Sequence, residues 1–433
     1  MDDQASAVRV PRVLLPQPGI DIARWAVIAC DQFTAEPDYW AEVEDVVGDA
    51  PSTLRMILPE LYLHAPDVAE RVAACQETMR RYEAEGILEA HEALLYVERQ
   101  VSRGVQRGLL VEIDLDAYDF RPQARTPIRA TEGTVIDRLP PRVAVRRDAD
   151  LELPHVLVLY DDPDGAVLAA VDAARDTLRT AYDADLMAGS GHLRGFLVED
   201  PDVQAATLAA LAALVTPEAY ARRYGLAADA PLLLAVGDGN HSLAAAATIW
   251  AEHKASGAGP DHPARYALVE LVNLHDPSLH FEPIHRLVTH APGLADALVA
   301  AVGGIVTPVP DAAAARDAVA DATGQVFALV SAAGVAVVEA RTPSHQLAVG
   351  TVQAFVDGWL AEHPHAEADY IHEGDVVDRL GRAPDALGIL LPGIAKEDFF
   401  ASVAVDGPFP RKTFSMGHGH DKRFYLECRR IRP

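Results

Sequence analysis

The chain has 433 residues, half of them hydrophobic and 23% charged, which is enough to build a substantial core in two or three domains. Its formal net charge of -27 opposes the phosphate backbone of a nucleic acid over most of the surface, so we expect no nucleic-acid partner. The first residues contain neither a basic start nor an apolar signal region, and no run of about 18 apolar residues offers a membrane span. Three isolated cysteines suit a reducing compartment, so we expect a soluble, cytoplasmic protein without a membrane partner. The sequence leaves the oligomeric state open.

The N-terminal third predicts helices packed beside a sheet. A short apolar strand ends at Cys30, and Asp31 and Gln32 follow it in a turn, where their side chains either line a site or only shape the turn. Helical spacing covers residues 38–47 and 65–85, and the alternation typical of paired strands covers residues 93–100 and 108–115.

A predicted loop at residues 128–142 concentrates arginines in an otherwise acidic chain. It reads IRATEGTVIDRLPPR, and its glycine and prolines favour a loop. Guanidinium groups bind phosphate oxygens well, so the segment is a candidate for nucleotide binding. The alternative is a solvated loop with internal ion pairs. Its charged candidates are Arg129, Glu132, Arg138 and Arg142.

The next predicted strand, residues 151–160, ends at two carboxylates. Asp161 and Asp162 are weak candidates for magnesium ligands, because hard cations prefer oxygen ligands, and the alternative is that they cap a turn. Alanine-rich helices are then expected at residues 166–182 and 205–220, with a glycine-rich turn or hairpin between them at 187–196, and a further strand is expected at 264–273.

The most informative stretch is LLLAVGDGNHSLAAAA, residues 232–247. An apolar run of strand length breaks into a turn, and the alanines that follow favour a helix that starts inside that turn. Glycines let a ligand approach the backbone, and the unpaired N–H groups of a helix start bind phosphate or carboxylate. Asp238 and His241 add a carboxylate and an imidazole, the groups that general acid–base catalysis uses. The candidates for phosphate binding are Gly237, Gly239, Asn240 and Ser242.

The same stretch has a plainer interpretation, because Asp and Asn in such turns often satisfy only the turn's own backbone. It is not a P-loop, since no Gly-Lys-Ser/Thr follows, and it lacks the third glycine of a dinucleotide-binding fingerprint.

From residue 292 the composition shifts to alanine and valine with short strands, which predicts a smaller α+β domain. Strands are expected at residues 325–331 and 334–340, and helix-like segments at 351–363 and 386–391. We therefore divide the chain into an N-terminal α/β region (1–105), a nucleotide-binding core (106–290) and a C-terminal α+β domain with a basic tail that returns to the core (291–433).

The tail is the last predicted element. Residues 408–430 read PFPRKTFSMGHGHDKRFYLECRR and interleave cations with apolar side chains, which favours an ordered tail on the body over a disordered end. Arg411 and Lys412 are the candidates to reach the anion site.

Three of these stretches together resemble the domain-of-unknown-function family 1015. The likeness runs over nearly the whole chain and rests on QRGLL with IRATEGTVIDRLPPR, on AVGDGNHSLAAA, and on PRKTFSMG with KRFYLECR. More common members carry Asp-Gly-His-His-Arg at the central turn, where this chain has Asn240 and Ser242 in place of a histidine and the arginine.

The central turn, with the earlier acidic loop, is also similar to the ParB/sulfiredoxin-like nucleotide-binding superfamily, which includes kinases of free serine and nucleotide hydrolases. This resemblance implies an α+β core, with a mixed sheet and packed helices, that binds ATP or ADP with magnesium. It matches Asp238 and Glu132 to two acidic positions of the kinases, and Asn240 and His241 to the phosphate-binding helix start.

These features predict a magnesium-dependent phosphotransferase that uses ATP or ADP to phosphorylate a small hydroxylated metabolite, with free L-serine as the first candidate. Phosphoryl transfer asks mainly for positioning and electrostatic stabilisation. One alternative is a non-enzymatic regulatory protein that binds a nucleotide. The other is a metal-dependent hydrolase of nucleotides or phosphoesters that uses Asp161 and Asp162.

Overall fold

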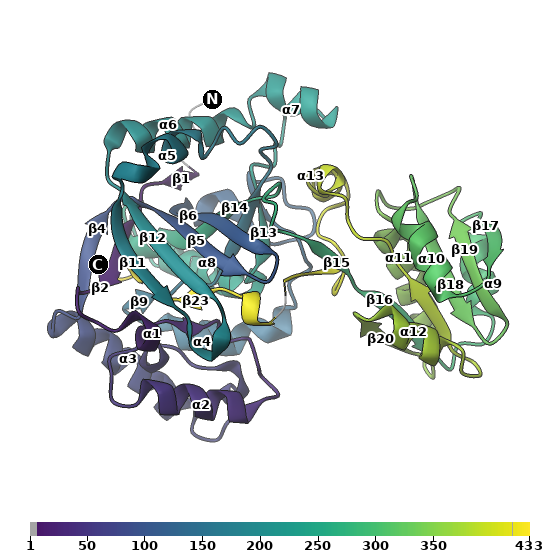
Figure 1. Ribbon diagram of the computed structural model, residues 1–433, viewed down its shortest axis with the longest axis horizontal. Coiled ribbons are helices and arrows are strands. Elements are labelled where there is room, and N and C mark those ends of the chain that lie inside the picture. The colour runs from purple at the N-terminus through teal and green to yellow at the C-terminus, as the bar shows by residue number, and fades with distance from the viewer. Residues whose placement is uncertain (1–6, 418) are drawn as a thin grey trace. The chain divides into compact units, whose positions relative to one another are not determined.

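The computed structural model describes residues 7–417 and 419–433. It divides into two compact units: unit 1 contains the residues up to Leu279 together with Gly417–Pro433, and unit 2 contains His280–Met416. Figure 1 shows unit 1 from purple to teal with the yellow end of the chain, and unit 2 mainly in green. The predicted boundary at residue 105 falls inside unit 1, within a strand.

Unit 1 combines short and long strands with helices. Its strands are β1 (Val8–Arg9), β2 (Arg12–Pro16), β3 (Val27–Ile28), β4 (Leu88–Glu92), β5 (Leu94–Val101), β6 (Gly104–Asp114), β7 (Tyr118–Asp119), β8 (Ile128–Ala130), β9 (Leu151–Glu152), β10 (Leu157–Tyr160), β11 (Arg179–Asp185), β12 (His192–Val198), β13 (Leu234–Asp238), β14 (Tyr266–Asn273), β23 (Phe424–Tyr425) and β24 (Arg429–Arg430). Its α-helices are α1 (Ile22–Trp25), α2 (Pro37–Val47), α3 (Val68–Ala84), α4 (Leu139–Arg147), α5 (Ala169–Ala174), α6 (Pro201–Ala213), α7 (Pro217–Tyr224) and α8 (Asn240–Ala255). Short 3-10 helices are η1 (Thr53–Arg55), η2 (Glu60–Tyr62), η3 (Leu115–Ala117), η4 (Ile136–Arg138), η5 (Arg175–Thr177), η6 (Met187–Gly189), η7 (Pro263–Arg265) and η8 (Gly419–Asp421).

The main sheet of unit 1 is mixed, which confirms the predicted α+β class. In the described part of the chain it has ten strands, in the order β11-β12-β5-β6-β14-β10-β13-β8-β7 with β1 beside β6. Most neighbours are antiparallel, but β10 runs parallel to β14, and β8 runs parallel to β13 and β7. Because β8 and β13 are parallel, the segments that follow them leave the sheet at the same edge.

Both faces of this sheet are buried, since successive residues of a strand point to opposite sides. In β5, Leu95 and Val97 face a core shared with α2, α3 and the C-terminal tail. Leu94 and Tyr96 face a second core formed with α5, α6, α7 and α8. Figure 1 shows α1, α2 and α3 on one side of the sheet and α5 and α6 on the other.

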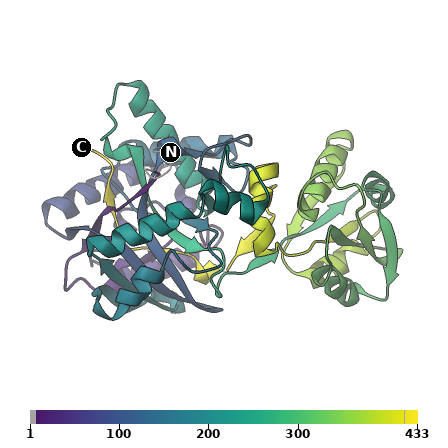
Figure 2. The ribbon, with the colours of Figure 1, turned by 90° about the horizontal axis from the view of Figure 1, so that it is seen from above.

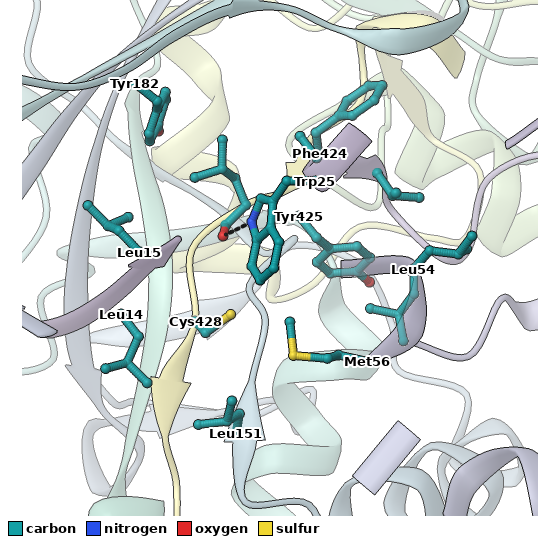
Figure 3. Packing of buried hydrophobic residues seen from close by; sticks show 14 of the residues in the cluster. Leu14, Leu15, Trp25, Leu54, Met56, Leu151, Tyr182, Phe424, Tyr425 and Cys428 are labelled. Atoms are coloured by element: carbon teal, nitrogen blue, oxygen red, sulfur yellow. Dashed lines mark hydrogen bonds between the residues drawn. The ribbon is translucent and has the colours of Figure 1, made fainter. Parts of the chain in front are cut away.

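The basic tail is ordered where it re-enters unit 1. β23 pairs with β3, β24 pairs with β9, and Leu14 bridges to Cys428, so the C-terminal tail lies beside strands of the N-terminal part of unit 1 (Figure 2). Figure 3 shows the indole Nε1 of Trp25 donating a hydrogen bond of 2.8 Å to the backbone oxygen of Leu426. The tail therefore completes the core instead of lying on its surface.

Unit 2 is a six-stranded antiparallel sheet covered by helices on both faces, in the order β17-β19-β18-β21-β16-β20. Its strands are β15 (Phe281–Pro283), β16 (His285–Thr289), β17 (Ile305–Val309), β18 (Val326–Ser331), β19 (Gly334–Glu339), β20 (Glu367–Ile371), β21 (Leu387–Leu390) and β22 (Phe414–Met416). Its helices are α9 (Leu294–Ala301), α10 (Ala312–Ala320), α11 (Ala348–Glu362), α12 (Gly374–Gly381) and α13 (Lys396–Asp406).

The helix predicted at 205–220 is divided into α6 and α7, and the strand predicted at 151–160 is divided into β9 and β10. Three further predicted segments differ from the structure. The helix expected at 166–182 ends early, and the chain turns into β11 because Arg179–Asp185 pairs with β12. The helix-like segment 386–391 is the buried strand β21 between β18 and β16. The predicted loop 128–142 contains β8 and the start of α4, whose two prolines occupy the first helical turn, where proline is tolerated. Among the described residues no helix is both long and apolar enough to cross a membrane.

Candidate functional site

The central turn leads from β13 directly into α8. β13 ends at Asp238, Gly239 takes the cap position with φ +78°, and α8 begins at Asn240. A side chain at Gly239 would meet Cα and Cγ2 of Val156 at 3.0 Å, so both the backbone conformation and the close packing favour glycine. The cap has no side chain to bond the first N–H groups of the helix, which leaves them available to a ligand.

Asp238 forms an ion pair with Lys422, which comes from the C-terminal tail. Its Oδ2 lies 2.9 Å from the Lys422 Nζ, and its Oδ1 accepts a 2.9 Å hydrogen bond from the Gly239 N–H. Burial raises the pKa of the Asp238 carboxyl, but the Lys422 ammonium, His155 and the Gly239 N–H together lower it by more, so that the net pKa lies below its ordinary value. For Lys422 the burial lowers the pKa and Asp238 outweighs it, so the net pKa is raised. The pair is charged at neutral pH.

His241 lies in the first turn of α8 and is held neutral. Its Nε2 accepts a 3.2 Å hydrogen bond from the backbone N–H of Val135, in the loop that follows β8. Burial and the charges of Arg142 and Arg138 lower the pKa of His241. A neutral imidazole that accepts at Nε2 carries its proton on Nδ1.

Asp31 reaches the same cluster from the N-terminal segment. The pairing of β3 with β23 places the turn after β3 next to the tail, and Asp31 Oδ1 accepts a 3.0 Å hydrogen bond from Gln32 Nε2. The negative charge of Asp31 favours the charged forms of both Lys422 and His241. Arg142 Nη2 lies 2.5 Å from Glu60 Oε1 beside it. Three carboxylates, an ammonium group and two guanidinium groups therefore lie around the start of α8.

Two buried polar atoms at this edge have no hydrogen-bond partner among the described residues. They are Asn240 Oδ1, on a residue with 8% of its surface exposed, and Thr134 Oγ1, in the loop after β8. Buried polar atoms are normally satisfied, so each of them calls for a ligand or ordered water.

The amino-acid sequence matches a model of a known protein family. A family model described as a protein of unknown function, DUF1015, matches residues 14–358. The chain belongs to the DUF1015 family. No curated protein sequence matches the chain.

Solved structures with a similar fold are distant from this DUF1015 member. Free serine kinase in complex with AMP has 10% identity and a TM-score of 0.38, covering 74% of this chain and 92% of its own. A conserved hypothetical protein from Pyrococcus furiosus has 11% identity and a TM-score of 0.36, covering 75% and 95%. SbnI with a C-terminal truncation, from Staphylococcus aureus, has 10% identity and a TM-score of 0.35, covering 71% and 82%. At these values the likeness assigns no ligand and no activity to the chain.

The structure brings part of the predicted site together. Asp238, His241, Arg138 and Arg142 belong to the cluster, and Glu132 follows β8 at the same edge of the sheet. The backbone candidates Gly237, Gly239, Asn240 and Ser242 form the end of β13 and the start of α8.

Other predicted residues lie elsewhere. Arg129 is buried and donates to the backbone oxygens of Thr126 (2.8 Å) and Ala230 (2.5 Å), which precede β8 and β13, so its guanidinium points away from Asp238. Arg411 and Lys412 belong to unit 2, whereas Lys422 belongs to unit 1.

Asp161 and Asp162 follow the carboxyl end of β10, which runs antiparallel to β13, so they lie at the opposite edge of the sheet from Asp238. Asp161 Oδ1 lies 2.7 Å from His275 Nε2, its Oδ2 accepts 2.5 Å from the Tyr224 hydroxyl, and Asp162 Oδ2 accepts 2.8 Å from the Val167 N–H. These oxygens are occupied by the protein, so the two residues do not fit a magnesium site. In the described ranges no group of three or more His, Cys, Asp or Glu could hold a metal ion.

Sequence reasoning missed Lys422 as a site residue, and it left the role of Asp31 open. Lys422 and Lys412 lie ten positions apart in one basic segment, and only the pairing of β23 with β3 shows which one returns to Asp238. The signal for Asp31 was present in the sequence, because it is a carboxylate directly after a short apolar strand.

Proposed function

We propose that this DUF1015 member is a nucleotide- and magnesium-dependent phosphotransferase that acts on a small hydroxylated metabolite, with free L-serine as the first acceptor to test. The observation that carries the proposal is the Asp238–Lys422 ion pair at the uncapped start of α8. A fixed cation beside free helix N–H groups is suited to a transferred phosphoryl group, whose charge must be stabilised in place.

Each group has a distinct part in this proposal. The backbone N–H groups at the start of α8, that of Asn240 included, donate to phosphate oxygens, and Lys422, Arg138 and Arg142 offset their charge. The acceptor hydroxyl oxygen bonds to the terminal phosphorus while the bond from phosphorus to the bridging oxygen breaks, and that electron pair leaves with the nucleotide. Glu132 positions the amine of an amino-acid acceptor.

The hydroxyl proton passes to Asp31. Both oxygens of Asp238 already accept hydrogen bonds, from Lys422 and from Gly239, and its pKa is lowered, which makes it a weak base. Asp31 keeps an oxygen beyond the one that bonds Gln32. Asp238 therefore positions Lys422 and orients the acceptor.

Magnesium enters with the nucleotide in this proposal. Mg²⁺ commonly keeps several waters and binds through substrate phosphates and one or two carboxylates, so it needs no complete protein cage. Glu132, which follows β8 at the same edge of the sheet, is the carboxylate that would hold it, and bound Mg²⁺ would offset charge on the phosphates.

The test is phosphorylation of hydroxy amino acids, followed by ³¹P NMR and mass spectrometry. The chain is incubated with Mg²⁺, ATP or ADP, and L-serine, L-threonine, L-homoserine or glycerate. We expect a phosphorylated acceptor and a loss of turnover of about 100-fold or more in Asp31→Asn, the lower end of what a general base contributes. Asp38→Asn, an exposed carboxylate nearby in the chain, is the matched control and should keep the activity.

Two other outcomes would replace the proposal. Binding of ADP without product from any acceptor would favour a nucleotide-binding regulatory protein. Release of phosphate without an acceptor would favour a hydrolase.

A further inference from the structure

His155 lies between the C-terminal tail and the central turn. It precedes β10 at the edge of the sheet where β13 ends, since Leu157 pairs with Asp238. Its Nδ1 lies 2.8 Å from the hydroxyl oxygen of Tyr425, and the two rings meet edge to face at 5.4 Å. On the other side of the imidazole, Cδ2 lies 3.4 Å from the position that a Cβ of Gly239 would occupy. One edge of the ring therefore faces the tail and the other faces the turn.

The Tyr425 hydroxyl has two possible acceptors for its single proton. Its oxygen accepts a 3.3 Å hydrogen bond from the Cys30 N–H, and its proton can go to His155 Nδ1 at 2.8 Å or to Cys30 Sγ at 3.1 Å. An imidazole nitrogen is a much stronger acceptor than a thiol sulfur. Burial raises the pKa of Tyr425 well above its ordinary value, so the hydroxyl keeps its proton and can donate it.

A neutral histidine whose Nδ1 accepts must carry its own proton on Nε2. Nε2 is bonded to Cδ2, the ring atom that faces Gly239, so this proton lies on the side of the turn. Among the described residues the one hydrogen bond of His155 is that with Tyr425. Next to Gly239, the uncapped start of α8 is the place where the phosphate of the proposed function binds.

We propose that His155 donates its Nε2–H to an oxygen of the phosphate bound at the start of α8, and that Tyr425 is the positioning residue that fixes this tautomer. The part concerning phosphate rests on the proposed function, whereas the tautomer does not. A neutral donor suits this place, because it orients the phosphate without adding a charge to a cluster that already contains Lys422 and two arginines.

The first experiment reads the tautomer in the unmodified protein. NMR spectra of the full chain, labelled with ¹⁵N and ¹³C at histidine, separate the Nε2–H from the Nδ1–H tautomer, and the spectrum of His155→Gln assigns the signal. We expect Nε2–H in the wild type and loss of that preference in Tyr425→Phe. Tyr182→Phe is the matched control, because it removes another buried hydroxyl, one bonded to Glu427, and should leave His155 unchanged. A proton on Nδ1 in the wild type would overturn the proposal.

The second experiment tests the contact with phosphate. Addition of Mg²⁺ and ADP should shift the Nε2 signal of His155 in the wild type. Gln places its side-chain amide near the position of Nε2 and Asn near that of Nδ1, so His155→Gln should bind ADP within a few-fold of wild type and His155→Asn at least tenfold more weakly. An unmoved Nε2 signal with bound ADP, or Asn binding as well as Gln, would refute the contact. If neither ADP nor ATP binds at all, the proposed function and the contact both fail, while the tautomer measurement still decides the role of Tyr425.

Discussion

Gly239 carries two separate constraints at the centre of the site. Its φ of +78° is in the left-handed region, and a Cβ would lie 3.0 Å from the backbone Cα of Val156. The first constraint belongs to the residue alone, and the second to its neighbours. Comparing two glycines separates the two costs.

We predict that Gly239→Ala destabilises unit 1 by about 1 kcal/mol more than Gly225→Ala does. Gly225 ends α7 with φ +66° and nothing within 4 Å of a Cβ, so alanine there meets only the conformational cost of about 1–2 kcal/mol. At Gly239 the contact with Val156 adds to that cost. Urea unfolding of both variants measures the difference. Equal losses would show that packing at Gly239 contributes nothing.

Burial of His285 should make the free energy of unfolding of unit 2 depend on pH. Burial and the neighbouring charges of Arg286, Arg316 and His372 lower its pKa to about 4, and its Nδ1 accepts a 3.1 Å hydrogen bond from the Leu391 N–H. The unfolded chain takes up a proton near pH 6.5 and the folded chain only near 4. The contribution of neutral His285 to the free energy of unfolding is therefore fully present above pH 6.5. About 3 kcal/mol of it is lost as the pH falls from 6.5 to about 4.

Hydrogen exchange of β16 and β21, measured from pH 7 to pH 4.5 and corrected for the intrinsic rate, reports this loss. In His285→Asn the amide oxygen can still accept from Leu391 but cannot titrate, so most of the dependence should disappear. A wild-type dependence that survives in His285→Asn would assign it to other groups.

Sequence patterns predict the secondary structure of a segment correctly where tertiary contacts do not override its local preference for helix or strand. The strands predicted at 108–115, 264–273 and 325–331 and the helix at 38–47 are confirmed, because alternation or helical spacing is clear in each. The helix predicted at 166–182 is wrong at its end, because the alanine-rich part is followed by β11, and the pairing of β11 with β12 is not visible in the local sequence. The strands that pair with the tail, β3 and β9, lie hundreds of residues away in the sequence, so local patterns could not predict these pairings either.

The tail is fixed to the sheet by a buried charge network. Arg423 Nε lies 2.7 Å from Glu270 Oε2 and Nη2 lies 2.7 Å from Glu427 Oε2, and all three side chains are at most 4% exposed. We predict that Arg423→Met destabilises unit 1 by about 3–5 kcal/mol, because it leaves buried Glu427 without its ion-pair partner and Glu270 with only Arg99, 3.8 Å away. Denaturant unfolding measures this.

Arg430→Met is the matched control in the same tail. Arg430 pairs with Glu83 but is 52% exposed, so its loss should cost less than about 1 kcal/mol. If Arg423→Met is as mild as Arg430→Met, the network holds the tail in register without stabilising it.

At the scale of the whole molecule, one chain builds unit 1 from two separated pieces. The first piece of unit 1 ends at Leu279, unit 2 follows, and the second piece of unit 1 begins at Gly417. The entry and exit strands of unit 2 are paired, with Phe281 opposite Met416, and directly opposed residues of an antiparallel pair lie about 5 Å apart. The separation of the two pieces in sequence therefore requires no separation in space.

We predict that replacing residues 280–416 by a short glycine linker leaves unit 1 folded. The linker has to span only a short gap, and shortening the connection lowers the entropic cost of bringing the tail back to β3. The measurements are urea unfolding and hydrogen exchange of β23, which should stay protected. A chain that ends at Met416 is the contrast: it lacks β23 and β24 and leaves Asp238 and Glu270 without Lys422 and Arg423, so it should fail to fold. If the linker variant unfolds as readily as the truncated chain, unit 1 depends on unit 2 for its stability and the two do not fold independently.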